Sequence, residues 1–495
     1  MTPMKTLLSG ATLFALTVLS GSPYSSAMAA ETKAASQAQI SITQAQLDTL
    51  LDEYKLSGVS LAVIDNYEVV LTASSGEKRF GSGQKIDDET AFSTASISKP
   101  VTALLVAMLE EQGKLSLDDS VSKYLKRWKL NSTDFPNPEA ITFRRLLSHT
   151  AGTTQGGFVD YYEGDDVPTA IDSLNGVKVP RYDKPISLMF EPGTSWAYSG
   201  GGYVIVQIAL EDLTGMSLPE LAQTMLFEPL NMSRTTMYQP NHDAFLSNVA
   251  SVHNDDLTVI GAGLPICPQI APSGMWSTPT DMAKLLIEMQ NALAGKQTQV
   301  ISDDVARTTT HIETLDVAGG WGLGWMRTEA KANQDWFSHG GSNTGTGGHI
   351  MGTMDGGRGI AIFGNGGNPA RIPVIEILSA DIMAQLGWNT SIANASQQAD
   401  QSTLKAIEGT YDLGFGQTLT VKQQANQLVY EGGLKLWSAD TSGVLVHVGE
   451  GKFATDGYAN LLSLDVLNNK KRLMVSRQGS DKVSYFPAVE PKPQG

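Results

Sequence analysis

The chain has a single cysteine, Cys267, among its 495 residues. One cysteine excludes an internal disulfide, and no partner stands at the spacing of a metal site. The seven histidines are scattered, without a His-x-x-x-His pair. The sequence therefore implies no metal and no other cofactor. Cys267 lies between Pro265 and Pro268, which favours a small buried residue, although a cysteine nucleophile is the alternative.

Basic clusters are also missing. The formal net charge is −16, and no run of Lys or Arg interrupts the acidic balance. Nucleic acid and anionic membrane surfaces are therefore poor partners for this chain. Beyond the N-terminal region, no apolar stretch is long enough to span a bilayer. We predict no transmembrane segment in the mature protein.

Residues 1–29 are typical of a signal peptide. Lys5 supplies the positive start, and residues 7–19 form an apolar run that is too short to cross a membrane. Ala27 and Ala29 are the small residues that precede a cleavage site. We predict cleavage after Ala29 and a periplasmic or secreted protein. A membrane anchor that stays attached is the alternative.

Strand and helix patterns alternate over residues 43–390. Apolar residues at helical spacing predict helices, and short apolar runs between turn residues predict strands. Strands come from both ends of this region, and its middle is helical. We therefore predict an α/β (α+β) fold with an antiparallel sheet, flanking helices and an inserted helical lobe. The predicted helices are 43–55, a stretch from near Ser96 to Gly113, 217–225, 281–290 and 373–386, and the predicted strands are 59–64, 69–73, 336–339, 348–351 and 359–363.

Composition divides the mature chain into two domains. Residues 30–393 form the larger domain, and Ser, Gln, Ala and Asp replace the apolar pattern in a linker at residues 394–402. Residues 403–495 alternate in the manner of strands and predict a small all-β domain. Its predicted strands are 419–421, 427–430, 444–448, 461–467 and 472–476, with Asn468-Asn469 as a hairpin turn.

The first candidate for chemistry is Ser96-Ile97-Ser98-Lys99. A serine and a lysine three residues apart at a helix start share one face of the helix. A neutral lysine can accept the serine proton, and burial and the helix N-terminus both disfavour the charged ammonium. Only this pair opens a long apolar helix after a strand-like approach. Four other pairs have the same spacing, so an ordinary helix start is the alternative: Ser75/Lys78, Ser82/Lys85, Ser120/Lys123 and Ser402/Lys405.

Two further segments lie downstream. Tyr198-Ser199-Gly200 follows a turn and precedes an apolar helix from Tyr203, and His339 ends a predicted strand before Gly340 and Gly341. Tyr198 as a core aromatic residue and His339 as a structural histidine are the alternative interpretations. The Gly-x-Ser-x-Gly nucleophile elbow is absent, which disfavours an α/β-hydrolase.

In this order the three segments resemble the Ser-x-x-Lys, Tyr-x-Asn and Lys/His-x-Gly motifs of the penicillin-recognising serine hydrolases. The chain is most similar to the branch of class C β-lactamases, D-aminopeptidases and family VIII esterases. The resemblance covers roughly residues 45–390 and implies a β-lactamase/transpeptidase-like fold. The terminal domain resembles the lipocalin-like β-domains of some members. Supporting segments are ITFRRLLSHTAG at 141–152, FEPLNM at 227–232 and SGMWST at 273–278.

The resemblance implies a role for each motif. Ser96 would attack a carbonyl carbon, and Lys99 and Tyr198 would share the proton transfers. The phenol would need a pKa below its usual value near 10, which a charged Lys99 would provide. The backbone N–H groups of Ser96 and Ser342 would form an oxyanion hole, worth about 3 kcal/mol per donor. The substrate would lie against His339, Gly340, Gly341 and Gly200.

Two departures from the family motifs affect the expected substrate. Gly200 replaces the asparagine of Tyr-x-Asn, and His339 replaces a lysine, so a permanent cation for a carboxylate is missing there. These changes favour an exported esterase or amidase that acts on a small molecule or peptide. A β-lactamase or DD-peptidase is the first alternative. A non-catalytic member that binds cell-wall peptides or a protein partner is the second.

Overall fold

The computed structural model describes several stretches of the chain. The predicted signal peptide and the first residues of the predicted linker lie outside them. Within these stretches, no helix has both the length and the apolar character that crossing a membrane requires. The described residues are 40–316, 320–327, 335–388, 396–414, 416–424, 427–433, 441–455, 460–477 and 480–489.

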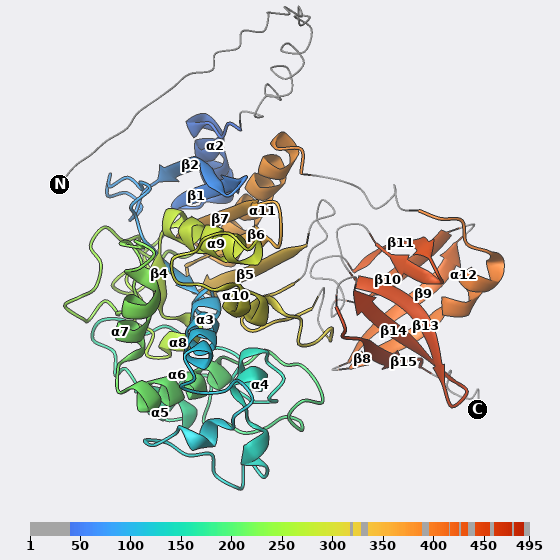
Figure 1. Ribbon diagram of the computed structural model, residues 1–495. Coiled ribbons are helices and arrows are strands. Elements are labelled where there is room, and N and C mark those ends of the chain that lie inside the picture. The colour runs from blue at the N-terminus through green and yellow to red at the C-terminus, as the bar shows by residue number, and fades with distance from the viewer. Residues whose placement is uncertain are drawn as a thin grey trace, which may run out of the picture. The chain divides into compact units, whose positions relative to one another are not determined.

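A five-stranded antiparallel sheet joins the two ends of the region 40–388 (Figure 1). The N-terminal strand β1 pairs with β2 on one side and with β7 on the other, so that Val59 lies opposite Gly364. Strands from distant parts of the sequence therefore share one sheet, as predicted. In spatial order the strands are β2 (Glu68–Gly76), β1 (Gly58–Asp65), β7 (Gly359–Gly364), β6 (Thr346–Thr353) and β5 (Trp336–Asn343).

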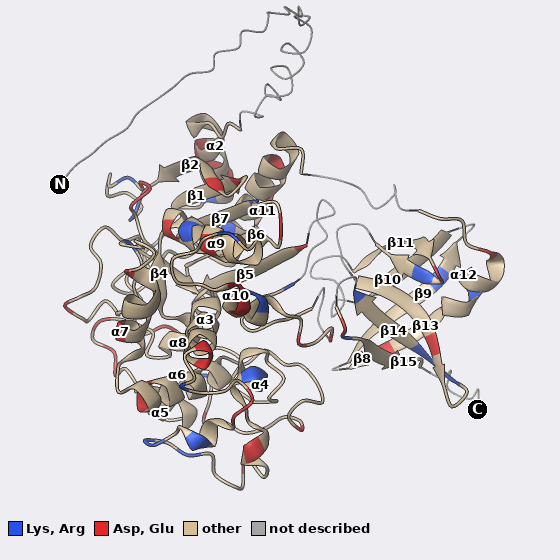
Figure 2. Ribbon diagram, viewed as in Figure 1, with Lys and Arg blue, Asp and Glu red and all other residues tan. Residues whose placement is uncertain are grey.

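Helices cover both faces of this sheet, and alternate residues of β1 enter two separate cores. Leu61 and Val63 belong to the core beneath α2 (Gln44–Tyr54) and α11 (Asn368–Gln385). Ala62 and Ile64 belong to the core beneath α9 (Pro279–Leu293). Both faces are buried, which explains why the central strands are almost free of charged residues in Figure 2.

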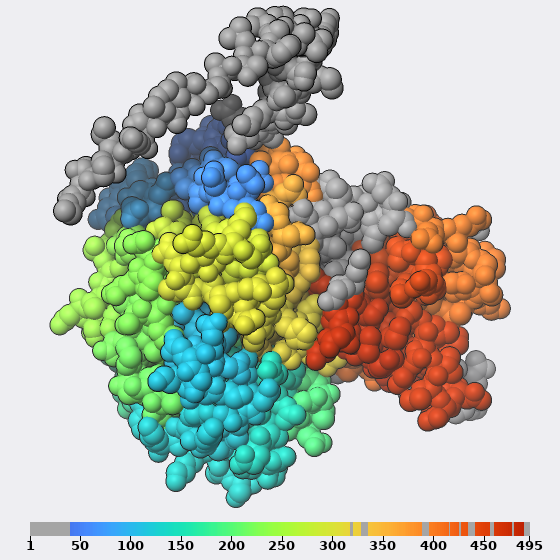
Figure 3. Space-filling view, viewed as in Figure 1, coloured from blue at the N-terminus to red at the C-terminus, as the bar shows by residue number. Residues whose placement is uncertain are grey.

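The first and last helices of this layer pack against each other. Gln46 on α2 donates a 2.8 Å hydrogen bond to Asp381 on α11. In Figure 3 the blue N-terminal segment and the orange segment that contains α11 accordingly lie side by side. The sheet and its covering helices are therefore completed only when both ends of the region have come together.

The helical lobe lies between β2 and β5 in the sequence. Its central helix is α3 (Ser98–Glu111), in which every residue from Ser98 to Leu109 is buried. The other elements of the lobe surround this helix or lead the chain to it. They are β3 (Phe92–Ala95), α4 (Phe143–Leu147), α5 (Ala170–Leu174), α6 (Gly200–Thr214), α7 (Leu218–Ala222) with the π-turn Gln223–Phe227, α8 (Ile270–Ser273), β4 (Met275–Ser277) and α10 (Asp303–Thr310), together with 3-10 turns at Val121–Lys123 and Pro138–Ala140.

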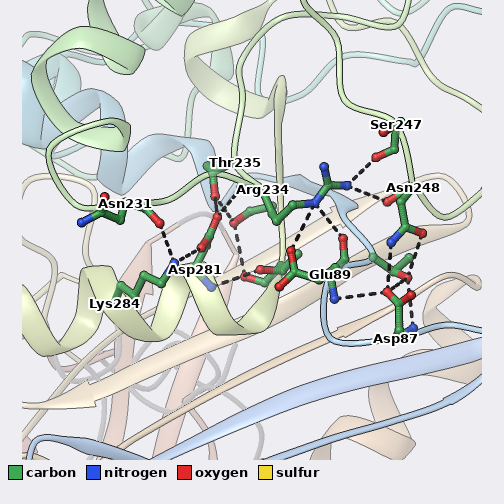
Figure 4. A network of polar contacts seen from close by, with 12 residues as sticks. Asp87, Glu89, Asn231, Arg234, Thr235, Ser247, Asn248, Asp281 and Lys284 are labelled. Carbon is green, nitrogen blue, oxygen red and sulfur yellow. Dashed lines mark hydrogen bonds and ion pairs between the residues drawn. The ribbon is translucent and has the colours of Figure 1, made fainter.

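A polar network fastens the start of α9 to the segments around β3 (Figure 4). The Arg234 guanidinium donates to the carbonyl oxygens of Glu89, at 2.9 Å, and Asn248, at 3.0 Å. The backbone N–H of Arg234 and the hydroxyl of Thr235 both donate to the Asp281 carboxylate, at 2.8 and 2.9 Å. Asp281 is almost fully buried, so these hydrogen bonds also compensate its desolvation.

Residues 396–489 contain a second, eight-stranded antiparallel sheet. Its first strand meets the end of its last strand through the Tyr411–Ala488 bridge, which makes a nearly closed barrel around a separate apolar core. The sequence predicted five of these strands and the turn at Asn468, but not β8, β12 or β15. The elements are α12 (Gln401–Ile407), β8 (Gly409–Gly414), β9 (Gln417–Gln424), β10 (Gln427–Gly432), β11 (Ser442–Gly449), β12 (Lys452–Ala454), β13 (Asn460–Leu467), β14 (Lys470–Arg477) and β15 (Ser484–Pro487).

Three predicted element boundaries were wrong. Helix α11 begins at Asn368 rather than Pro373, because Pro369 occupies its first turn and Pro373 is accommodated inside the helix. Helix α6 begins at Gly200 rather than Tyr203. Strand β5 continues through its two glycines to Asn343, because the pairing with β6 is unbroken over that stretch. Glycines were interpreted as breaks in both places, but Gly341 and Gly200 lie where neighbouring atoms approach the backbone closely.

Candidate active site

Ser96 lies in the short connection between β3 and α3. A register shift interrupts the β3–β4 pairing at Ser93–Ala95, and Ala95 has a left-handed φ of 51°. The Ser98 hydroxyl donates to the Ala95 carbonyl at 2.6 Å and accepts from the Met275 N–H at 2.9 Å. These contacts hold a strained backbone just before Ser96, which is where functional sites commonly store strain.

Lys99 lies one turn along α3, and its amine is directed at Ser96. The Nζ–Oγ distance is 3.0 Å, and Nζ also donates to the Pro272 carbonyl at 2.9 Å. Lys99 is only 2% exposed, and no carboxylate of the described residues lies within salt-bridge distance. Burial lowers the pKa of Lys99 well below its ordinary value. Burial therefore favours the neutral amine, which is the form that can accept a proton.

Tyr198 reaches the same place from the segment before α6. Nζ of Lys99 lies 4.6 Å from the centroid of its ring, and its hydroxyl is hydrogen-bonded with Ser96. Burial raises the pKa of Tyr198, and that hydrogen bond offsets only part of the increase. The expected depression of this pKa by Lys99 was wrong, because burial disfavours the charged phenolate and raises the pKa instead.

An aromatic cluster supports Tyr198 from behind. The ring of His149 lies 4.3 Å from that of Tyr198, between centroids, and Trp321 lies 5.9 Å from it. His149 is almost fully buried, and its pKa is lowered, mainly by burial and then by Lys99. The sequence favours an architectural role for His149, because the LLSHTAG segment resembles a helix end, and the structure places its ring against Tyr198.

Ser96, Lys99 and Tyr198 line one cavity of about 450 Å³. Gly200 and Ser342 line it as well, so five of the eight predicted site residues meet there. The Ser342 hydroxyl donates to Asn368 Oδ1 at 2.6 Å. The cavity is large enough for a small molecule or the end of a peptide.

His339, Gly340 and Gly341 do not line this cavity, which corrects the expectation that they form its substrate side. His339 is 3% exposed, its Nδ1 lies 2.6 Å from the Gly340 carbonyl oxygen, and burial lowers its pKa to about 3. An ideal Cβ on Gly341 would lie 2.0 Å from the Thr94 carbonyl. Strand β5 therefore packs tightly against the segment that leads to Ser96, and Gly341 has no room for a side chain. The ring of His339 packs against the rings of Tyr198 and Trp321.

Packing around position 200 favours glycine over the asparagine of the family motif. An ideal Cβ at this position would lie 3.1 Å from the Gly156 carbonyl and 3.3 Å from the Phe158 ring. Phe158 therefore fills the space that a side chain at position 200 would need.

Sequence reasoning missed three residues around the cavity. The Pro272 carbonyl contacts Lys99, Asn368 accepts from Ser342, and Arg181 lines the wall. The Val-Pro-Arg-Tyr sequence at 179–182 is a turn signal that could have singled out Arg181. Nothing in the local sequence marks the Pro272 carbonyl, because only the packing of α8 on α3 brings it to Lys99.

The first two motifs meet in one cavity, and the model of the Beta-lactamase family matches residues 43–381. The chain belongs to the Beta-lactamase family. The resemblance drawn from the three motifs is thereby confirmed, and the chain falls within a superfamily of serine hydrolases. Within the Beta-lactamase family, Gly200 and the buried His339 are departures from the motifs expected at these positions.

Relatives of this Beta-lactamase family member include a penicillin-binding protein and a teichoic acid D-alanine hydrolase. Penicillin-binding protein 4* of Bacillus subtilis is 29% identical over 39% of this chain and 41% of its own length. The teichoic acid D-alanine hydrolase of Staphylococcus aureus is 28% identical over 48% of this chain and 57% of its own length. The chain thus spans less than two thirds of either relative. The fold resembles that of an octameric penicillin-binding protein homologue from Pyrococcus abyssi, with a TM-score of 0.55, 20% identity and coverage of 90% of this chain and 98% of that chain.

Proposed function

We propose that this protein is a serine hydrolase that cleaves esters or amides through an acyl-enzyme on Ser96. The observation that carries the proposal is the 3.0 Å separation between Ser96 Oγ and Lys99 Nζ, in a buried environment that lowers the pKa of the amine. A neutral amine has a lone pair for the serine proton, whereas an ammonium has none. The arrangement therefore activates the oxygen near neutral pH.

In the proposed acylation, Lys99 takes the proton of Ser96 as Oγ bonds to the substrate carbonyl carbon. The developing oxyanion accepts hydrogen bonds from the backbone N–H groups of Ser96 and Ser342. Tyr198, a neutral phenol because its pKa is raised, gives its proton to the leaving group as the carbon–heteroatom bond breaks. The protonated Lys99 then returns a proton to Tyr198.

In the proposed deacylation, a water molecule loses a proton to Lys99 and attacks the acyl carbon. The bond from Oγ to that carbon breaks, and the proton returns to Ser96. His339 takes no proton in either half, because its pKa is lowered to about 3 and its side chain is buried behind Tyr198. The cycle therefore needs only Ser96, Lys99, Tyr198 and the two backbone donors.

The similarity to penicillin-binding protein 4* supports a second candidate, a β-lactamase or penicillin-binding DD-peptidase. The D-alanine hydrolase relative supports cell-wall components as the partner, and the pattern of residues 1–29 supports export to the periplasm or medium. Sequencing the mature N-terminus tests the export proposal. A protein that starts at Ala30 agrees with it, and one that retains residues 1–29 contradicts it.

The test of the main proposal is labelling and turnover. A fluorophosphonate probe should give one adduct, on Ser96, and Ser96→Ala should lose both the adduct and the hydrolysis of a p-nitrophenyl ester, by at least about 10³-fold. Ser98→Ala is unsuitable as a control because Ser98 supports the backbone, so exposed Ser82→Ala is the matched control. Undiminished rates in Ser96→Ala would reject the proposal.

Nitrocefin hydrolysis and labelling by a fluorescent penicillin decide for the second candidate, and absence of every adduct on Ser96 decides for a non-catalytic binding protein.

A further inference from the structure

The turn between β5 and β6 carries one half of the proposed oxyanion hole. The backbone N–H of Ser342 donates to the oxyanion in the proposed mechanism, and residues 342–345 line the active-site cavity. Such a donor stabilises a transition state only when it is held within about 0.5 Å of its productive position. The contacts that fix this turn therefore bear directly on catalysis.

Asp160 connects this turn to a second segment of the cavity wall. Its Oδ2 accepts a hydrogen bond from the Thr344 N–H at 3.2 Å, although the two residues are 184 positions apart in the sequence. Phe158, two residues before Asp160, lines the cavity, whereas Asp160 itself does not. The carboxylate therefore acts on the reaction only through the residues that it holds.

Cys267 supplies a second hydrogen bond to this carboxylate. Its thiol donates to Asp160 Oδ1 at 3.2 Å, and its sulfur accepts from Asn343 Nδ2 at 3.7 Å. Burial raises the pKa of Cys267, so the thiol retains the hydrogen that it donates. Because Asn343 and Thr344 are consecutive, these contacts form a closed ring that begins and ends on the turn.

Buried hydrogen bonds fix the side of the ring that lies away from the turn. The N–H of Tyr161 donates to the Ile266 carbonyl at 3.1 Å, and the N–H of Ile266 donates to the Tyr161 carbonyl at 2.7 Å. The Cys267 N–H donates to Oε1 of the buried Gln239 at 2.9 Å. Asp160 and Cys267 are thus each next to a backbone pair that holds them in place, and the ring transmits this support to the turn.

Resting on the proposed function, we propose that Asp160 is a positioning residue that holds the Ser342 N–H in the oxyanion hole through Thr344. Cys267 orients the carboxylate for this contact. The role concerns the transition state, because the oxyanion gains its charge there and the bound substrate needs the donor less. Loss of the ring should therefore lower kcat and leave KM nearly unchanged. The single cysteine then has a function without being a nucleophile.

Asp160→Ala tests the inference by kinetics and by labelling with the fluorophosphonate probe. We expect kcat for a p-nitrophenyl ester to fall about 10- to 100-fold, with KM changed less than about 2-fold. The rate of Ser96 labelling should fall in parallel, because the phosphonyl oxygen occupies the same oxyanion hole. Asp160→Asn keeps an acceptor for the Thr344 N–H and should recover part of the loss. Asp166→Ala removes a carboxylate that is 77% exposed in the same loop and should change neither rate.

Two substitutions of Cys267 repeat the test with a smaller change. Cys267→Ala removes the donor to Asp160 and should lower kcat about 3- to 10-fold, whereas Cys267→Ser keeps a donor and should retain most of the activity. Thermal melts establish which variants are folded. If Asp160→Ala does not fold, the two Cys267 variants decide the inference.

The outcomes separate this inference from the proposed function. A folded Asp160→Ala protein with the parent's kcat and labelling rate would overturn the inference, and so would a loss confined to KM. Equal losses in Cys267→Ala and Cys267→Ser would overturn the role of the thiol. Each of these results leaves hydrolysis at Ser96 standing. A parent protein that neither labels nor hydrolyses the ester would overturn the proposed function, and the inference with it.

Discussion

His149 accepts hydrogen bonds from the residues immediately before and after Tyr198. The N–H of Ala197 donates to the His149 carbonyl at 3.0 Å, the N–H of Ser199 donates to His149 Nδ1 at 3.1 Å, and the two rings pack 4.3 Å apart. His149 itself has a left-handed φ of 61°, a conformation that costs of order 1–2 kcal/mol for most residues. This strained histidine therefore fixes where the phenol lies.

We predict that His149 acts as a positioning residue for Tyr198. His149→Asn keeps a side-chain acceptor and tolerates the left-handed backbone, whereas His149→Phe keeps a ring but leaves the Ser199 N–H unpaired. Both variants should lower kcat about 10-fold or more with KM nearly unchanged, and His149→Phe should also lose about 1–3 kcal/mol of stability. Steady-state kinetics and thermal melts measure this. Folded variants with the original kcat would contradict it.

Lys99 should make stability depend on pH in a definite direction. Its folded pKa lies well below the ordinary lysine value of 10.5, so the unfolded chain binds one more proton between these two pKa values. The free energy of unfolding therefore rises with pH across that window, and the neutral amine costs stability at pH 7. Lys99→Met should be more stable than the parent near pH 7, and the difference should shrink toward pH 10.5. Urea melts across pH 6–10 measure the gap, and a gap independent of pH would contradict the lowered pKa.

The same substitution should remove the base. We expect Lys99→Met to reduce ester turnover by about 10³-fold, while the parent keeps its activity well below pH 10.5 because the amine is already neutral there. A pH profile of kcat/KM measures where activity falls on the acid side as Lys99 becomes protonated. A parent enzyme that becomes active only near pH 10.5 would contradict this assignment.

Gly200 and Phe158 should be coupled. Gly200→Asn places a side chain 3.3 Å or less from the Phe158 ring, so it should destabilise the protein by about 1–3 kcal/mol. Phe158→Ala in the same chain should relieve most of that cost, which a double-mutant cycle of melting free energies would reveal. Additive effects of the two substitutions would show that the Phe158 ring and the side chain at position 200 do not compete for the same space.

Gly341 should tolerate no side chain. In Gly341→Ala the new Cβ would meet the Thr94 carbonyl, so β5 must move away from the segment that leads to Ser96. We expect a loss of about 3 kcal/mol and a fall in turnover together. Gly340→Ala is the matched control, because an ideal Cβ there has its nearest neighbours at 3.9 Å. Similar stability for the two variants would contradict the tight packing.

Much of the architecture follows from local patterns. Helix α2, the strands β1 and β2 and the long apolar helix α3 form where the spacing of apolar residues predicts them. Errors occurred where glycine was interpreted as a break. Gly341 continues β5 where the Thr94 carbonyl leaves no room for a Cβ, and Gly200 starts α6 where Gly156 and Phe158 leave little room, and only the packed structure contains that information.

The sequence by itself determined the candidate pair, since a Ser-x-x-Lys spacing at a helix start is a local property. It could not distinguish the chemistry of the pairs: the side chains of Lys85 and Lys123 are 74% and 62% exposed, whereas Lys99 is 2% exposed. Only the tertiary structure decided that Lys99 is buried with a lowered pKa, that Tyr198 and the Pro272 carbonyl reach it, and that His339 is buried while Arg181 lines the cavity. Desolvation and contact depend on segments far apart in the chain, and spacing along one segment does not encode them.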